Sequence, residues 1–273
     1  VLENNTFSVN TTDGYGVRLK DSTTAVVTMK DGNVITAANA LVLGKNAEAG
    51  NKGQFAVEGG TYVGTIVKNT TSADATVVIT GGTFGEAPSA EFVAEGFKVT
   101  DNGDGTFGVG EFVAAKIGDT TYSDLNRALN DAVASGTSVT VEIVSDIDLT
   151  GKTWTPVNVT GCGVITVEGN NHTIKGLSDM LFGSTWAGRS GLIIKDLTIA
   201  DSNIVHDPDD VTETVGVGAF VGYPEASETI ILDNCHLVNS TVNGGHWTGG
   251  LVGACAGWNG NGPVFTTLTI TNC

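Results

Sequence analysis

One short loop carries the side chains best suited to bind a hard cation. It reads His206-Asp207-Pro208-Asp209-Asp210, and carboxylate oxygens are the ligands that Ca²⁺ prefers. A run of charges around a proline is equally typical of a loop exposed to water. We predict no obligatory cofactor, and the one candidate metal site is a calcium site at Asp207, Asp209 and Asp210.

The carboxylates of this chain form no recognisable catalytic pattern. Glycosidic bonds are usually hydrolysed by two carboxylates that face each other across a cleft. Here Asp209-Asp210 is the one pair of adjacent aspartates, and Arg189 has no evident acidic partner. We therefore predict no catalytic residue and a protein that is not an enzyme. A polysaccharide lyase or glycoside hydrolase is kept as the alternative.

The tryptophans are the side chains best suited to hold a sugar, because the C–H face of a pyranose stacks on an aromatic ring. Tryptophan is also a common anchor of loops. Trp247 lies in a loop rich in glycine and asparagine, as does Trp258. We predict that Trp186, Trp247 and Trp258 contact a glycan.

The four cysteines are Cys162, Cys235, Cys255 and Cys273. None of them is spaced from a histidine as zinc ligands are. Cys235 and Cys273 occupy the same place in a repeat, so adjacent strands would bring their Cα atoms to about 4.8 Å, within disulfide range. Leu197 fills the preceding equivalent place, which favours a stack of free thiols. A disulfide between Cys235 and Cys273 stays open as the alternative.

A repeat positions these residues in the C-terminal part of the chain. Three segments align without gaps: Leu192–Leu197, Ile230–Cys235 and Leu268–Cys273. Alternate positions in each are apolar and so face one side of a strand. The Asp or Asn that follows suits a corner, because these residues tolerate turn geometry. The spacing of 38 residues predicts that Asp196, Asn234 and Asn272 stack as a ladder.

The N-terminal part has a shorter repeat. Val57–Tyr62 recurs as Ile79–Phe84, 22 residues later. The next two strand-like segments flank the Gly-containing loop at 101–105 and predict a hairpin. An amphipathic helix follows over 123–134, with Ser123 as its expected cap and Gly136 at its end. We predict two parts, a β-solenoid and hairpin segment at 1–112 and a helix-capped parallel β-helix with 38-residue repeats at 113–273.

Composition limits the partners. The formal charge is −17, with 13 basic and 30 acidic residues among 273. A nucleic-acid partner requires a basic face, so it is not expected, and neither is an anionic membrane surface. No apolar run reaches the length of a membrane helix, so we expect no direct membrane insertion. We also expect the chain to be part of a longer one, with targeting and anchoring segments elsewhere.

Several short motifs resemble known families. Ile117-Gly118-Asp119-Thr120-Thr121-Tyr122, with the helix after it, resembles the N-terminal cap of pectin-lyase-like right-handed β-helix proteins. Gly-Gly-Leu-Val-Gly at 249–253, with Ile270-Thr271-Asn272-Cys273, resembles the GLUG-type repeats of large bacterial surface proteins. The segment from Gly81 to Phe107 is similar to modules of gut-bacterial surface proteins. Of the motifs that hydrolases of the β-helix family carry, the chain has only Asp209-Asp210.

The expected fold class is all-β, a right-handed parallel β-helix, or solenoid, with one capping α-helix. The resemblances imply an extracellular protein of the bacterial cell surface with an adhesin role. They do not imply an enzymatic activity. We predict a module that binds glycans or host surface proteins without catalysis. Besides the enzyme, the second alternative is a structural stalk that binds nothing.

Overall fold

The computed structural model describes residues 1–20, 24–186, 191–209, 216–224, 229–245, 247–254, 257–258, 263–264 and 267–273. Within these ranges, the side chains of 45–48, 184–186, 257–258 and 263–264 lie outside the description. The chain divides into two units, Val1–Phe112 and Val113–Cys273. Strands dominate both units and confirm the all-β class; α1 is the one α-helix in the described residues.

The first unit contains ten strands and one 3₁₀ turn within its described residues. They are β1 Thr6–Ser8, β2 Tyr15–Leu19, β3 Val26–Met29, β4 Val34–Glu48, β5 Gln54–Val57, β6 Thr61–Thr70, β7 Thr76–Ile79, β8 Thr83–Phe84, η1 Ala90–Phe92, β9 Phe97–Asp101 and β10 Phe107–Glu111.

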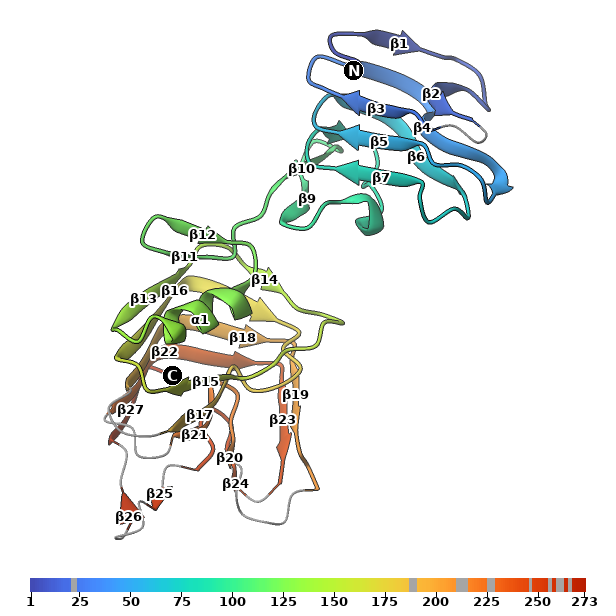
Figure 1. The fold of residues 1–273 in the computed structure, drawn as a ribbon. Helices are drawn as coiled ribbons and strands as arrows, with labels where there is room; N and C mark the ends of the chain where they lie inside the picture. The colour runs from blue at the N-terminus through green and yellow to red at the C-terminus, as the bar shows by residue number, and fades with distance from the viewer. Residues whose placement is uncertain are drawn as a thin grey trace. The chain divides into compact units, whose positions relative to one another are not determined.

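Two sheets of parallel strands build most of this unit (Figure 1). The strands β1, β4, β6 and β8 follow one another in the larger sheet, and β3, β5 and β7 form the smaller one. Thr61 pairs with Thr83 across β6 and β8, so the 22-residue repeat places equivalent residues side by side. The antiparallel pair of β9 and β10, with Asp101 opposite Phe107, confirms the predicted hairpin.

The core of the first unit is filled by the alternate side chains of these strands. The rings of Tyr62 and Phe84 stack with centroids 5.2 Å apart and planes 14° apart. Met29, Phe55 and Ile79 enter the same core from the smaller sheet and are fully or almost fully buried. Burying a side chain of this size contributes roughly 1.5–3 kcal/mol, so the repeat is stable only when its copies stack.

The second unit contains the remaining elements. They are β11 Ala115–Ile117, β12 Thr120–Tyr122, α1 Leu125–Ala134, β13 Val139–Ile143, β14 Ile147–Asp148, β15 Val157–Thr160, β16 Val164–Lys175, β17 Phe182–Trp186, β18 Gly191–Ala200, β19 Asn203–His206, β20 Gly216–Val217, β21 Val221–Pro224, β22 Thr229–Val238, β23 Thr241–Gly244, β24 Trp247–Thr248, β25 Gly257–Trp258, β26 Pro263–Val264 and β27 Thr267–Thr271.

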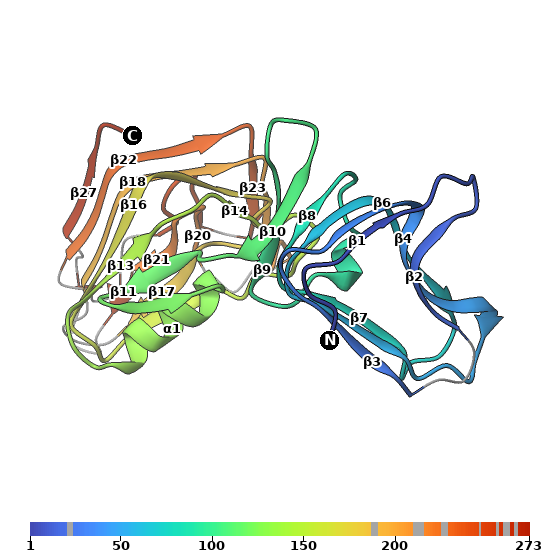
Figure 2. The same ribbon diagram turned by 90° about the horizontal axis from the view of Figure 1, so that it is seen from above.

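The largest sheet of this unit follows the predicted repeat. Strands β13, β16, β18, β22 and β27 are neighbours in that order and all pair in parallel. Leu192 pairs with Ile230, and Ile230 pairs with Leu268, so the three aligned segments lie in register. Strands β15, β17 and β21 form a second, smaller parallel sheet. Figure 2 shows strands β16, β18 and β22 of the large sheet side by side.

The helix α1 packs against β11, β12, β13 and β15, at the first strands of the second unit. Leu125, Ala128, Leu129 and Ala132 make up its buried face. Its N-cap is Asp124, whose carboxylate accepts the backbone N–H of Asn126 at 2.8 Å, so the expectation of Ser123 as the cap is wrong. The cap therefore lies one residue later than predicted, and the helix begins at Leu125.

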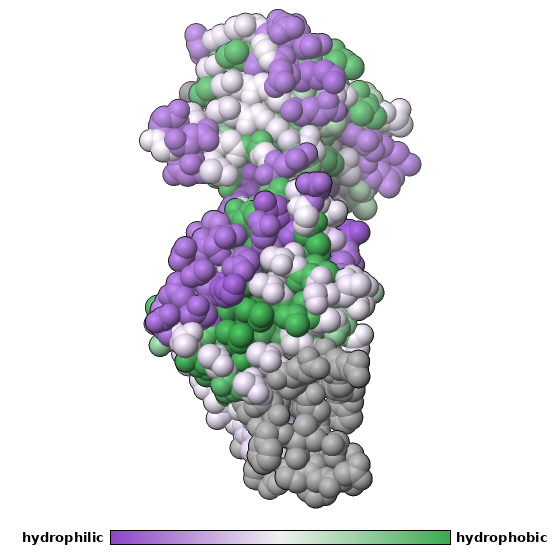
Figure 3. All heavy atoms as spheres, turned by 90° about the vertical axis from the view of Figure 1, so that its left-hand side faces the viewer, coloured by the Kyte–Doolittle hydropathy of each residue, from purple (hydrophilic) through white to green (hydrophobic). Residues whose placement is uncertain are grey.

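The outward face of the large sheet carries a row of charged residues. The row runs through Lys116, Glu142, Glu168, Lys195 and Asp233. Two ion pairs join neighbouring strands, Lys116 with Glu142 at 3.1 Å and Lys195 with Glu168 at 3.0 Å. Figure 3 shows hydrophilic and hydrophobic areas side by side on the visible face of this unit. Among the described residues, no helix has the length and apolar character to cross a membrane.

Candidate functional site

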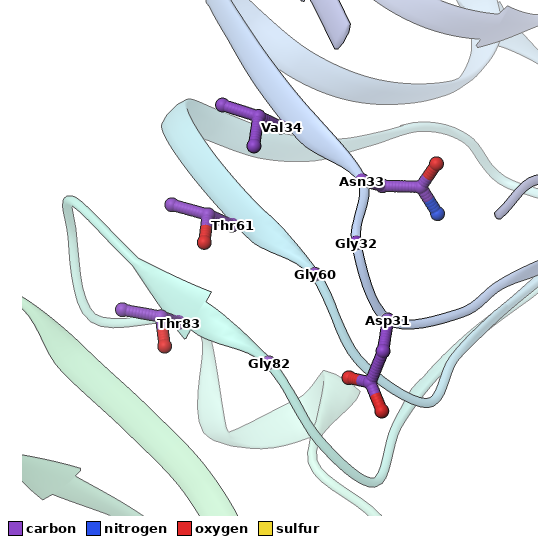
Figure 4. Close-up of a pocket in the computed structure, with 8 residues that line it drawn as sticks. All are labelled: Asp31, Gly32, Asn33, Val34, Gly60, Thr61, Gly82 and Thr83. Carbon is purple, nitrogen blue, oxygen red and sulfur yellow. The ribbon is translucent and has the colours of Figure 1, made fainter. Parts of the chain in front are cut away.

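A groove of about 320 Å³ crosses the starts of β4, β6 and β8 in the first unit. It is lined by Asp31, Gly32, Asn33, Val34, Gly60, Thr61, Gly82 and Thr83. Figure 4 shows the side chains of Val34, Thr61 and Thr83 pointing to the same side, one from each strand. The register explains this row, because Val34 pairs with Thr61 and Thr61 pairs with Thr83.

Glycines before each strand give the groove its depth. Gly60 has a φ of 99° and Gly82 a φ of 111°, values that L-residues with a side chain rarely adopt. A Cβ atom on Gly59 would lie 1.9 Å from Oδ1 of Asp31, so a side chain there would displace the aspartate. The Gly-Gly-Thr motif thus keeps the backbone bare where Asp31 approaches it.

A buried amide and a buried phenol hold the rim of the groove in place. Asn33 is 1% exposed and donates hydrogen bonds to the carbonyl oxygens of Leu2 at 2.8 Å and Lys30 at 2.7 Å. The hydroxyl of Tyr62 donates to the carbonyl oxygen of Gly59 at 2.7 Å. Burial raises the pKa of Tyr62, so the phenol stays protonated and keeps donating. Satisfied buried groups of this kind rigidify their surroundings.

The groove presents hydroxyls, one apolar side chain and one carboxylate to a ligand. The hydroxyls of Thr61 and Thr83 have no hydrogen-bond partner in the described part of the chain. Val34 is 41% exposed, and Asp31 is the one charged residue of the lining. Hydroxyls both donate and accept, and a carboxylate accepts from two donors at once. This combination suits a ligand with adjacent hydroxyl groups and an apolar C–H face.

An ion pair next to the groove limits its charge. Nζ of Lys30 lies 3.0 Å from Oε2 of Glu58, and this hydrogen bond raises the pKa of Lys30. Both side chains are about half exposed, so the pair is a weak contributor to stability. Glu58 and, more weakly, Asp31 raise the pKa of Lys30, so the lysine offsets part of both negative charges.

The tryptophans predicted to bind glycans have different settings. Trp247, in β24, stacks on Tyr223 with ring centroids 5.6 Å apart and planes 19° apart, and both residues are partly exposed. Trp186 ends β17 and Trp258 ends β25, but their side chains lie outside the described ones. The fourth tryptophan, Trp154, is 5% exposed and packs in the core.

The acidic loop is described only in part. Asp207, with a φ of 35°, and Asp209 are exposed, and Asp210 lies outside the described residues. Nδ1 of His206, before them, donates a hydrogen bond to Oδ2 of Asp179 at 2.9 Å. Among the described residues, no three His, Cys, Asp or Glu side chains are grouped to hold a metal ion. Calcium binding here remains a prediction.

The corner residues of the repeats contact one another. Nδ2 of Asn234 donates to Oδ1 of Asp196 at 2.6 Å, and both residues have left-handed backbones, with φ of 53° and 49°. Asn272 has the same backbone, with a φ of 58°, and donates to Oδ1 of Asp233 at 3.0 Å. The hydrogen bonds from Thr271 and Asn272 lower the pKa of Asp233. Asn234 thus bonds to the equivalent corner residue of the repeat before it, whereas Asn272 bonds to Asp233, the residue before Asn234.

A second corner repeats the arrangement. Nδ2 of Asn239 donates to Oδ1 of Asp201 at 2.6 Å, again 38 residues away. Both residues have positive φ angles, 49° and 46°. The repeat that contains β22 thus turns twice, at Asn234 and Asn239, through an asparagine whose side chain bonds to an aspartate of the repeat before it.

In the described residues, Cys162, Cys235 and Cys273 form no disulfide, and Cys255 lies outside these residues. The backbone N–H of Cys235 donates to Sγ of Cys273 at 3.3 Å, so the two residues are neighbours. Cys235 pairs with Leu197 on its other side. The interpretation as stacked free thiols agrees with this geometry.

The groove residues were not among the predicted site residues. The Gly-Gly-Thr repeat was visible in the sequence, and it did signal that Thr61 and Thr83 would lie together. No such signal marks Asp31 and Val34. The segment Asp31-Gly32-Asn33-Val34 lacks the Gly-Gly-Thr motif, and the spacing from Val34 to Thr61 differs from that between Thr61 and Thr83.

Comparison with known proteins gives no relative. No family model, no curated protein and no solved structure matches this chain.

Proposed function

We propose that this chain is an extracellular repeat module of a bacterial cell surface that binds glycans without catalysis, in the manner of an adhesin. Its proposed architecture is a right-handed parallel β-helix in which each repeat adds one turn. The parallel, in-register strands support this architecture, as does the helix packed on the first strands of the second unit.

The groove of the first unit is the observation that carries the proposal. Hydroxyls of Thr61 and Thr83 lie on neighbouring strands, about 4.8 Å apart as in any sheet, and are open to hydrogen bonds from sugar hydroxyls. Val34 offers an apolar contact to a pyranose C–H face, and Asp31 can accept from two adjacent hydroxyls. Rigid rims around the groove reduce the entropy lost when a ligand binds.

A glycan array with the whole chain, followed by titration calorimetry on the strongest ligand, tests the proposal. Thr61→Val and Thr83→Val keep the β-branched shape and remove two hydroxyls. Since each net hydrogen bond contributes about 0.5–1.5 kcal/mol, we expect the double variant to bind roughly tenfold more weakly. Thr76→Val, on β7 of the other sheet, is the matched control and should bind normally.

The stacked pair of Tyr223 and Trp247 is the second candidate contact with a glycan. Flat rings that keep part of their surface exposed can support a sugar. Trp247→Ala separates the two locations: binding lost in this variant and retained in the Thr61 and Thr83 variants would place the ligand in the second unit.

Two other functions are distinguished by the same samples. Release of reducing ends or unsaturated products from pectins, mucin glycans or hemicelluloses, with loss of turnover in Asp209→Asn, would identify a polysaccharide-degrading enzyme. A chain that binds nothing on the array and cleaves no polymer would be a structural stalk.

A further inference from the structure

We propose that Cys235 and Cys273 form a disulfide that joins neighbouring repeats when the protein meets a thiol oxidant. This modification site belongs to the second unit, whereas the groove belongs to the first, and it does not depend on the proposed function. The protein then has two states, one in which both thiols are free and one in which a disulfide joins them.

The two cysteines occupy equivalent places on adjacent strands. Each follows an asparagine with a left-handed backbone, Asn234 with a φ of 53° and Asn272 with a φ of 58°. Asp233 pairs with Thr271 just before these corners, so the chains leave the pairing in step. Neighbouring strands bring equivalent Cα atoms to about 4.8 Å, and disulfides span Cα separations of about 4.4–6.8 Å.

The contacts of the sulfur atoms define the movement that bonding requires. Sγ of Cys273 lies 3.3 Å from the backbone nitrogen of Cys235 and so already lies against its partner residue. Each sulfur also donates to a carbonyl oxygen on the repeat before its own, Cys235 to Ile194 at 3.3 Å and Cys273 to Leu232 at 3.6 Å. To form the bond, the Cys235 side chain must leave its weak sulfur hydrogen bond and rotate toward Cys273.

The two thiols differ in accessibility, which sets the order of the steps. Cys273 is exposed, whereas Cys235 is fully buried. Burial raises the pKa of Cys235 to about 12, so its thiolate is scarce at neutral pH. The neighbouring Cys273 and Asp196 also raise the pKa of Cys235. Cys273 is therefore the thiol that meets the oxidant, and Cys235 is the slow second partner.

With oxidised glutathione as the oxidant, the exchange balances in two steps. The Cys273 thiolate attacks one sulfur of the glutathione disulfide, forms a mixed disulfide and releases one glutathione thiolate. The Cys235 thiolate then attacks Sγ of Cys273 and displaces the second glutathione thiolate. Both protein protons end on the two glutathione molecules, and the two electrons lost by the protein thiols reduce the glutathione disulfide.

The test is a redox titration of the whole chain, in a Cys255→Ala background, with mass spectrometry. After incubation in a tenfold excess of oxidised over reduced glutathione, acid quenching and alkylation, we expect a chain that lacks two of the alkyl groups of the reduced one. It should be lighter by these two groups and by a further mass of about 2 Da. Peptide mapping should join the peptides of Cys235 and Cys273. Amides of β27 should then exchange at least tenfold more slowly than in the reduced protein.

Variants separate this bond from other products. Cys273→Ser changes an exposed residue and should abolish the bond while the fold is retained; Cys162→Ser is the control and should leave it unchanged. A chain that carries glutathione on Cys273 and never closes would overturn the proposal. A bond from Cys273 to Cys162 would do the same.

Discussion

Replacing Leu129 by alanine tests whether α1 seals the first strands of the second unit. Leu129 is 1% exposed and lies on the buried face of the helix. Truncating a buried leucine costs about 2–5 kcal/mol, which combines the lost transfer free energy with the cavity left behind. In a unit of this size, a loss of about 3 kcal/mol lowers the melting temperature by roughly 6–12 °C.

Tryptophan fluorescence reports this loss selectively, because Trp154, Trp186, Trp247 and Trp258 all belong to the second unit. The measurement is urea unfolding of the whole chain, compared at equal m-values. Arg127→Ala on the same helix removes a side chain that is 77% exposed and should change the free energy of unfolding by less than about 0.5 kcal/mol. Equal midpoints for the Leu129 and Arg127 variants would refute the assignment of α1 as a cap.

Three further predictions concern stability. Burial raises the folded-state pKa of Cys235 to about 12 and also raises that of Tyr62. The free energy of unfolding should therefore be greatest below the unfolded-state pKa values and fall as the pH rises above about 9, by up to about 1.4 kcal/mol per pH unit and group. Urea midpoints that stay constant from pH 8 to 10.5 would contradict this. Asn234→Ala loses a residue suited to a φ of 53° and the bond to Asp196, and should lower the free energy of unfolding by about 1–3 kcal/mol, with partial recovery in Asn234→Gly; fluorescence-monitored urea unfolding measures both. Gly64→Ala would place a Cβ 1.8 Å from the carbonyl oxygen of Ala37, at a φ of 126°. The free energy of unfolding should fall by about 3 kcal/mol or more, which lowers the melting temperature measured by far-UV circular dichroism. A melting temperature equal to that of the wild type would show that the backbone at Gly64 adjusts at little cost.

The repeat and its pairing could be predicted because they depend on local patterns. Alternating apolar residues select one face of each strand, and equal spacing brings equivalent residues together, as Leu192 and Ile230 illustrate. The helix cap was placed one residue early, since Ser123 and Asp124 are both good caps and only the backbone decides which carboxylate or hydroxyl reaches the free N–H groups.

The candidate site could not be predicted as a whole, because it depends on register between unlike segments. Val34 lies beside Thr61 through pairing of β4 with β6, and this part of the chain shares no motif with the Gly-Gly-Thr repeat. The same is true of Tyr223 and Trp247, which come together from separate short strands. Contacts of this kind follow from how the chain returns to the sheet, which the residue pattern does not specify.

The repeats differ in length, and this difference bears on which insertions the stacked strands tolerate. Glu168 and Lys195 are bonded across neighbouring strands 27 residues apart, while Asp196 and Asn234 are bonded across the next pair 38 residues apart. The pairing is the same in both cases, so eleven additional residues leave the stacked strands undisturbed. Insertions between the strands are thus tolerated by the framework, because the entropy of closing a longer loop rises only slowly with its length. The stacked strands can stay constant while the segments between them vary in length and composition. The exposed surface of such a protein can therefore change during evolution without loss of the strand pairing that stabilises it.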